Sequence, residues 1–475
     1  MSTSETQSKE SAEVLHGNVS PEEFAEKPLD EQLTESKHYY PNGKPYWFRS
    51  TFFQATIVGI CALLAPGIYN AMQSTGAAGN FTPYLVMRAN SILNSLMFVV
   101  CFLGSTVASK IGLKWTFAFG TTGYAIYAAS IYVNNRYGTE WFVYLGAACC
   151  GLSAGIFWAA EGAIMIGYPE EEKRGRYLAY WLAYRNSGSI IGGAINLGFN
   201  SKGKTVGKLN WKTYIVFVAL QSLAPFVALF VSPPHKVQRI DRKKLVMERK
   251  IPVLQELKEV TQLMFTRDIL LVLPLFFYAT YDLSYISSYL TLYFTTRARA
   301  LASLVAALLQ ILGNLFFGTF LDWKRFSINQ KAKYGFIFMM VMHGASWIYG
   351  TVVQHDYTTN PPKLDWSDGA SFGRGWTVYL WWQLNFSLIY NYCYWMVGYM
   401  SKRESDHVRH TSILRGIEAA GGAVASGISS TTAPLIASLG INFGLWALCI
   451  PFAWFVVRDI GKPKVKSSDE ELIEE

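Results

Sequence analysis

Long apolar stretches, separated by short polar or charged segments, run through most of the chain. A window of about 19 residues, close to the length that crosses a bilayer as a helix, picks out twelve of them. Backbone groups in lipid must be hydrogen-bonded internally, so stretches this long are predicted to be helices. They lack the polar–apolar alternation over about ten residues that marks a barrel strand. The predicted spans lie near 50–72, 84–107, 114–133, 141–167, 177–199, 211–232, 269–290, 300–321, 334–353, 375–399, 412–437 and 441–457.

Two polar regions lie outside these spans. Residues 1–45 are polar and acidic with few large apolar side chains, which is typical of a disordered tail, and they lack the apolar run of a cleaved signal peptide. Residues 233–266 are hydrophilic, and the pattern at 253–260 predicts a short amphipathic helix on the membrane surface. We therefore divide the chain into a tail (1–45), a six-helix bundle (46–232), a central loop (233–266), a second six-helix bundle (267–458) and a second tail (459–475).

Composition and charge agree with a membrane protein. The chain is 51% hydrophobic and 16% charged, which disfavours a soluble enzyme or a disordered scaffold. The net charge of +9 could point to nucleic acid. However, if the N-terminus is cytoplasmic, the loops and tails on that side hold more than three times as many lysines and arginines as the opposite loops. Positive residues gather on the cytoplasmic side of a membrane. We therefore predict an integral multi-pass protein with both termini cytoplasmic, in the plasma membrane or an endomembrane, and no nucleic-acid partner.

The two predicted bundles share a pattern in their fifth spans. Arg185 is followed by Gly192-Gly193, and Arg415 is followed by Gly421-Gly422. Because small residues let helices approach closely, the glycines predict tight packing. Two interpretations stay open: ordinary helix packing, or the close interface that two halves need to move against each other.

Several motifs resemble known transporter families. The loop after the second span of the second bundle reads Gly318 to Asp322 and then Trp323-Lys324-Arg325, similar to a signature of the major facilitator superfamily, although the first bundle has Ser109 at the acidic position. The segments at 65–79, 157–163, 168–176 and 294–301 resemble signatures of the uncoordinated-93 family in its fungal form.

This resemblance implies an all-α fold of twelve transmembrane helices, arranged as two pseudo-symmetric six-helix bundles. It also implies that Asp322 holds one conformation against a helix N-terminus and a nearby arginine. Some animal members of the family are trafficking or channel-regulating partners, so the resemblance allows a membrane-protein partner.

Charged residues within spans are costly and mark candidate functional sites. Glu161 and Arg185 lie on consecutive spans at similar depth and are expected to pair, and Arg415 and Glu418 are three residues apart on one helix face. Structural locking or gating is one interpretation of these pairs, and direct substrate contact is the other.

Asp282 lies deeper than the other acids, about 20 Å into the seventh span. It is a candidate proton-coupling carboxylate. The alternatives are that it pairs with Arg88, which lies one turn into the second span, or that it caps a broken helix.

Uncharged polar and aromatic residues in the spans are candidates for the lining of a cavity. Two pairs are each four residues apart in the second span of a bundle, which places each pair on one helix face. The candidates are Asn70, Asn90, Asn94, Gln310, Asn314, Gln383, Trp382 and Tyr390.

Taken together, these patterns predict a secondary transporter that moves a small solute by alternating access between two halves, with proton coupling as a hypothesis. The alternative is a non-transporting regulator or trafficking partner of another membrane protein. Nucleotide-loop and nucleophile-elbow motifs are absent, and all six cysteines fall inside spans without metal-ligand spacing. We therefore expect no enzymatic activity, no cofactor and no metal. The expected partners are the lipid bilayer and a small-molecule substrate.

Overall fold

The structure is a computed structural model that describes residues 45–80, 82–170, 173–204, 207–242, 245, 253–400 and 404–462. The predicted tails, apart from residue 45 and residues 459–462, lie outside this part of the chain.

The first half of the chain forms six helical spans. The first span consists of α3 (Thr51–Ala62), a five-residue π-helical turn (Leu63–Gly67) and α4 (Ile68–Gln73). The π-helical turn contains Pro66, which has no N–H to donate to the helix ladder. The other five spans are α5 (Tyr84–Ile111), α6 (Leu113–Tyr137), α7 (Trp141–Gly167), α8 (Arg174–Asn200) and α9 (Trp211–Ala228).

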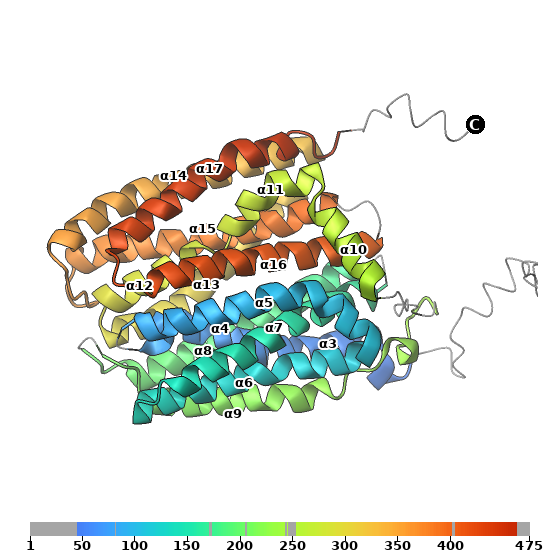
Figure 1. Ribbon diagram of the computed structural model, residues 1–475, viewed down its shortest axis with the longest axis horizontal. Helices are drawn as coiled ribbons and strands as arrows, with labels where there is room; N and C mark the ends of the chain where they lie inside the picture. The colour runs from blue at the N-terminus through green and yellow to red at the C-terminus, as the bar shows by residue number, and fades with distance from the viewer. Residues whose placement is uncertain are drawn as a thin grey trace, which may run out of the picture.

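The second half repeats this plan. Its first span is also interrupted, as α11 (Arg267–Tyr278) and α12 (Asp282–Tyr293). The remaining spans are α13 (Thr296–Asp322), α14 (Ile328–Thr359), α15 (Ala370–Met400), α16 (Glu404–Ser429) and α17 (Leu435–Val457). Figure 1 shows the two sets of helices as two neighbouring bundles, so the predicted all-α fold of two six-helix bundles is confirmed.

Eight spans in the described chain are, by length and composition alone, apolar enough to cross a membrane. The other four helices, α6, α8, α15 and α16, are 25 to 31 residues long and lie in the same bundles. A helix of 20 residues already covers about 30 Å, so each of these four is long enough to cross the hydrocarbon core.

The bundles have two ends, one of which carries the central segment. We call the end where α3 begins and α17 stops the terminal end, and the opposite end the loop end. The helix α10 (Val253–Met264) falls on the predicted amphipathic stretch and lies at the terminal end, beside α5 and α16 (Figure 1). One side of α10 is buried at Val260 while Leu254 is 80% exposed. Glu259 forms an ion pair with Arg409 of α16 at 2.6 Å, which ties the central segment to the second bundle.

The predicted boundaries of the eleventh span were wrong. We expected it at 412–437, but α16 covers Glu404–Ser429 and α17 already begins at Leu435. The intervening residues include Pro434, which cannot continue a helix from the preceding turn. The predicted span extended across this turn because the residues in the turn are small and uncharged.

Glycines of α8 pack against both halves of the molecule. A Cβ on Gly192 would lie 2.5 Å from the Cβ of Ala71 on α4, in the same half. A Cβ on Gly193 would lie 2.6 Å from the Cα of Leu304 on α13, in the other half. Both distances are well below van der Waals contact. The helices therefore lie closer together at these two glycines than a residue with a Cβ would allow.

The glycines of α16 make equivalent contacts in the second half. A Cβ on Gly421 would collide with the carbonyl oxygen of Phe277 on α11, in the same half. A Cβ on Gly422 would lie 3.2 Å from the Asn94 side chain on α5, in the other half. In each half, then, one glycine of the pair packs the fifth helix on its own first span and the next packs it on the second helix of the other half.

Candidate functional site

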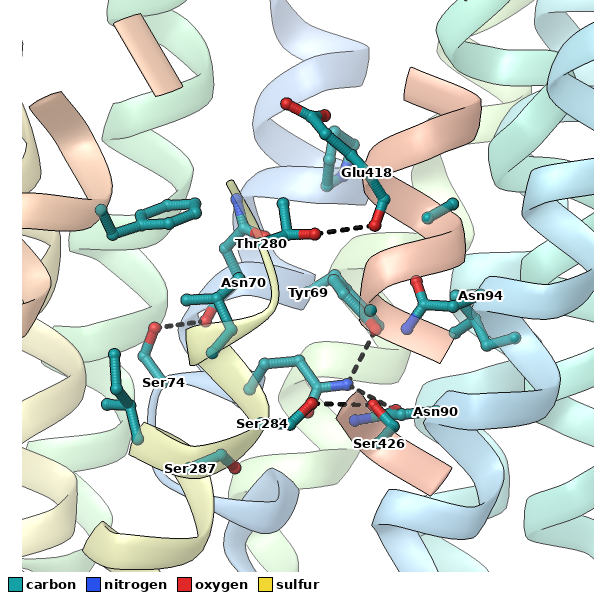
Figure 2. Close-up of a pocket in the computed structure, with 18 of the residues that line it drawn as sticks. Tyr69, Asn70, Ser74, Asn90, Asn94, Thr280, Ser284, Ser287, Glu418 and Ser426 are labelled. Carbon is teal, nitrogen blue, oxygen red and sulfur yellow. Dashed lines mark hydrogen bonds between the residues drawn. The ribbon is translucent and has the colours of Figure 1, made fainter. Parts of the chain in front are cut away.

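A cavity of about 250 Å³ lies between the two bundles. Residues of α4, α5, α7 and α8 line it from the first half, and residues of α12, α13, α15 and α16 line it from the second (Figure 2). Drug-sized ligands occupy pockets of roughly 300–1,000 Å³, so this cavity is suited to a smaller molecule.

Amides and hydroxyls line the part of the cavity around α4 and α5. Gln73 donates through Nε2 to the Tyr69 hydroxyl at 2.8 Å and to Asn90 Oδ1 at 3.2 Å. Across the cavity, Gln310 donates to Gln383 at 3.0 Å. Further hydroxyls come from Ser284 and Ser426, which are 2.9 Å apart, and from Ser74 and Ser287 (Figure 2).

Two of the predicted lining amides have unused hydrogen-bonding groups. Asn70 on α4 and Asn94 on α5 both line the cavity, and their side chains bond to no other side chain or backbone group in the described part of the chain. Both side chains are half-buried, and polar groups that are removed from water normally find a partner. These two are therefore free to bind a hydroxyl or carbonyl group in the cavity.

Toward the terminal end, two arginines share the same aromatic side chains. The guanidinium carbon of Arg415 lies 4.0 Å from the centre of the Trp158 ring, and that of Arg185 lies 4.9 Å from it. Both arginines also donate to the hydroxyl of Tyr390, Arg185 at 3.1 Å. Cation–π contacts of this kind stabilise a guanidinium that is removed from water.

The acids near these arginines are placed differently from one another. Arg415 Nη1 lies 3.0 Å from Glu418 Oε2, so these two form an ion pair. Glu161 and Arg185, by contrast, do not form the expected pair in the described chain. The Glu161 carboxylate accepts a hydrogen bond from Trp181 Nε1 at 2.7 Å instead, and Glu161 does not line the cavity.

Asp282 lies at the break between α11 and α12. It is buried and is the first residue of α12, where an acidic side chain lies at the positive end of the helix dipole; Tyr281 rather than Asp282 is at the N-cap, and no side-chain cap forms there. Its Oδ1 has no partner among the described residues, and it does not line the cavity. Arg88 is exposed on α5 and forms no ion pair with Asp282 in the described chain, so the predicted pairing of these two residues is wrong.

Two other predicted residues lie away from the cavity. Trp382 is buried in an aromatic cluster inside the second bundle, where its ring lies 5.1 Å from that of Tyr285 and 5.5 Å from that of Trp347. Asn314 lies one helical turn beyond Gln310 on α13, and its backbone oxygen accepts from Asn391 at 3.2 Å. The expectation that Asn314 and Trp382 line the cavity was therefore wrong: the Asn314 backbone bonds to α15, and Trp382, which is itself on α15, packs against α12 and α14. Asp322 is the last residue of α13, and its side chain lies outside the described part of the structure.

The loop end of the interface is closed by an arginine that we did not predict as a site. Arg299 of α13 is fully buried and donates to backbone carbonyls of the first half: Thr75 at 2.8 Å, Gly76 at 2.7 Å, Asn80 at 2.8 Å and Gly207 at 3.2 Å. We call Arg299 and these four carbonyls the loop-end latch. It was missed because the eighth span was predicted to start at residue 300, which assigned Arg299 to a loop.

An ion pair lies beside the latch, between Arg297 in the first turn of α13 and Asp365 in the loop before α15. Arg297 Nε donates to Asp365 Oδ1 at 2.7 Å, and the hydroxyl of Thr295 donates to the same oxygen at 2.6 Å. The Arg297 guanidinium, together with the hydroxyl donors, holds the pKa of the Asp365 carboxyl well below its usual range. In the part of the chain that the structure describes, His, Cys, Asp and Glu side chains form no group of three that could hold a metal.

Several lining residues could have been found from the family motifs. Tyr69 and Gln73 lie within the segment 65–79, and Trp158 lies within 157–163. We selected candidate lining residues by their polarity within a span, and Trp158 is not polar enough to be selected. The position of Trp158 next to two arginines becomes visible only once α7, α8 and α16 are placed side by side.

Comparisons with known proteins agree with this fold. A family model described as "Ion channel regulatory protein UNC-93" matches residues 82–345. The Notoamide biosynthesis cluster protein O' of Aspergillus versicolor is 40% identical over 87% of this chain and 90% of that protein, and an UNC93-like protein of Schizosaccharomyces pombe is 28% identical over 79% and 76%. A crystal structure of a D-xylose-proton symporter superposes with a TM-score of 0.60 at 11% identity, covering 87% of this chain and 99% of that one. This likeness shows a fold shared with major facilitator transporters.

Proposed function

Since the chain belongs to the UNC-93 family and has the fold of major facilitator transporters, we propose that it is a secondary transporter of a small solute. The observation that carries the proposal is the cavity between the halves, with unused amides in its wall and a closed loop end. Transporters of this plan bind substrate near the middle of the membrane, where two repeats meet.

Alternating access requires that each end of the interface opens in turn. At the loop end, the latch must release for the halves to part. At the terminal end of the cavity, Arg185, Arg415 and Glu418 are the candidates for the opposing gate, because Tyr390 of the second half bridges to Arg185 of the first. We propose the same gating function for Glu161, through Trp181, and for Asp322 at the end of α13.

The charge distribution supports an orientation in which both termini and α10 are cytoplasmic. The loop end then faces the exterior or the lumen of an organelle. In that orientation the conformation with the latch formed is closed to the outside.

Proton coupling is a second part of the proposal. Asp282 is buried at the break in the seventh span with one carboxylate oxygen unpartnered. Protonation there would change the charge at the first turn of α12, a helix whose other residues line the cavity. Arg88, which is exposed at the loop end of α5, would act only after a rearrangement that brings it to the interface.

Uptake by proteoliposomes that contain only this protein tests the proposal. We expect accumulation of a small solute that is saturable and that depends on an imposed pH gradient in the wild type. Asp282→Asn should abolish the dependence on the gradient and leave facilitated exchange. A wild-type protein without flux for any solute in a broad screen would contradict transport.

A second candidate function comes from the description of the matching family model. If the chain is a regulator of an ion channel or another membrane protein, it should copurify with a stoichiometric membrane partner from native membranes. Such a partner, combined with no flux in proteoliposomes, would favour regulation over transport.

A further inference from the structure

The charges that line the cavity do not cancel. Three lining residues are charged: Arg185, Arg415 and Glu418. Arg415 and Glu418 form an ion pair at 3.0 Å and neutralise each other. Arg185 therefore contributes one positive charge to the cavity without a carboxylate partner among the described residues.

The contacts of Arg185 leave much of its hydrogen-bonding capacity unused. A guanidinium has five N–H donors. Arg185 uses Nη1 for the neutral hydroxyl of Tyr390 at 3.1 Å, and its face lies over the Trp158 and Tyr390 rings, at 4.9 and 5.4 Å. Ring faces stabilise the cation but accept none of the edge donors in the plane of the guanidinium.

Glu161 is the other carboxylate near Arg185, but the two form no ion pair in the described chain, and its Oε2 is buried without a partner there. One of its oxygens accepts from the Trp181 indole at 2.7 Å, and the side chain is outside the cavity wall. A ligand in the cavity would thus reach the edge of Arg185 without displacing an existing ion pair.

The rest of the wall offers neutral polar groups. Asn70 and Asn94 have free amides, and the hydroxyls of Ser74, Ser284 and Ser426 face the same space (Figure 2). These groups can bind hydroxyl or carbonyl oxygens but cannot neutralise a charge.

We propose that the cavity binds a small organic monoanion, a carboxylate that also bears hydroxyl or carbonyl groups, with its carboxylate on the edge of Arg185. Bidentate carboxylate recognition is the geometry for which a guanidinium is suited, and the ligand would remove the cost of an unpaired cation in a low-dielectric site. This inference rests on the proposed transport function for its biological meaning, but binding can be measured without it.

The test uses the full-length protein in detergent and three hydroxy acids of increasing size: lactate, mandelate and quinate. Each acid is compared with its neutral amide by isothermal titration calorimetry and by thermal shift. We expect at least one acid to bind about tenfold or more tightly than its amide, since hydrogen bonds to charged groups are the stronger ones. The preference should disappear in Arg185→Gln and persist in part in Arg185→Lys, which keeps the charge but not the planar fork.

Arg374→Gln is the matched control. It removes an arginine from an exposed ion pair with Asp356 at the loop end, and the acid preference should be unchanged. If Arg185→Gln does not fold, the acid-to-amide ratio of the wild type and of Arg185→Lys still decides the question.

Three results would overturn the assignment. In the first, acids and amides bind equally or not at all. In the second, the acid preference is intact in Arg185→Gln. In the third, 2-amino-1-phenylethanol, which has an ammonium and no carboxylate, binds more tightly than mandelate, which would assign recognition to the unpartnered Oε1 of Glu418 instead.

Uptake of the same probes into proteoliposomes separates this inference from the proposed function. Flux of a neutral solute with no preference for acids would retain transport and reject the anion site. Binding with the expected preference but no flux would retain the site and reject transport.

Discussion

Arg299 is fully buried and has no acidic partner in the described chain. All of its hydrogen bonds go to backbone carbonyls of the other half. All four carbonyls lose the Arg299 donor in Arg299→Ala, and among the described residues only that of Gly76 keeps a backbone donor, the N–H of Gly79. Leaving buried polar groups unsatisfied costs about 1–3 kcal/mol, so the variant should unfold at a lower temperature.

The same variant should also open the loop end. With Ser74→Cys as a reporter in the cavity, labelling by a membrane-impermeant maleimide is expected to be several-fold faster in Arg299→Ala than in the parent. The control Arg374→Ala should change neither quantity. Equal labelling rates in the two proteins would show that the latch does not hold the loop end closed.

Asp365 gives a prediction for pH, because it lies outside the spans and its pKa is lowered by Arg297. A lowered pKa in the folded state means that the ionised carboxylate stabilises the fold above its ordinary pKa of about 4. This stabilisation is lost as the pH falls below that value toward the folded-state pKa. The difference in melting temperature between the wild type and Asp365→Asn should therefore be largest near pH 7 and shrink below about pH 4.

Asp356→Asn is the control for this series, since Asp356 forms an exposed ion pair with Arg374. Exposed pairs contribute about 0–1 kcal/mol, so its melting temperature should stay close to that of the wild type at every pH. A difference for Asp365→Asn that does not change with pH would mean that packing rather than charge is responsible.

The residues around the cavity show which parts of the candidate site could be predicted from the sequence. Nine of the predicted site residues line the cavity: Asn70, Asn90, Asn94, Arg185, Gln310, Gln383, Tyr390, Arg415 and Glu418. A polar residue inside an apolar helix is a strong signal, because lipid does not accept it. Arg299 gave no such signal, because a position so close to the start of α13 is indistinguishable from a loop position until the helix start is known.

At the scale of helices, two glycines of α8 allow a comparison between a position in the interface of the halves and a position outside it. A Cβ on Gly193 would lie 2.6 Å from the backbone of Leu304, whereas a Cβ on Gly198 meets no atom within 4 Å. Alanine favours a helix over glycine by about 1 kcal/mol. We therefore expect Gly198→Ala to be neutral or slightly stabilising, and Gly193→Ala to weaken the contact between the halves and to reduce uptake in proteoliposomes.

The measurement is the melting temperature and the uptake rate of the two variants side by side. If Gly193→Ala behaves like Gly198→Ala in both, the close approach at Gly193 has no function in the interface. Gly422→Ala offers a second comparison on α16, where the nearest atoms belong to the flexible side chain of Asn94 and a smaller effect is expected.

Helix boundaries were harder to predict than helix number. Hydropathy measures the part of a helix that lies in lipid, but α14 and α15 continue to 32 and 31 residues, beyond the predicted spans at both ends. The break in the first span was not predicted, and the break in the seventh was raised only as one of the alternatives for Asp282. Tyr278 and Asp282 lie on opposite sides of a turn that interrupts an otherwise apolar run, and the Thr280 hydroxyl in this turn donates to the backbone oxygen of Glu418 on α16, a contact that sequence spacing does not reveal.

For the whole molecule, the relation between the halves could be predicted only in outline. The matching Arg and Gly-Gly patterns indicated a repeat, and the structure adds that each pair contacts the second helix of the opposite half. Sequence spacing reports contacts along one helix, not contacts between helices far apart in the chain. The cavity, which exists only where the halves meet, could therefore not be located from spacing alone.

Alternating access predicts that fastening the halves together at the loop end stops transport. Asn196 of α8 donates to Ser303 of α13 at 3.0 Å across the interface, so the pair Asn196→Cys and Ser303→Cys places two thiols close to each other. We expect oxidation of this double variant to abolish uptake and a reductant to restore it. The control pair, Asn200→Cys and Thr213→Cys, replaces a 3.1 Å contact between two helices of the first half, and its oxidation should leave uptake intact. Undiminished uptake after complete cross-linking of the inter-half pair would mean that the loop end does not open during transport, and the two halves would then have to be treated as a single rigid unit.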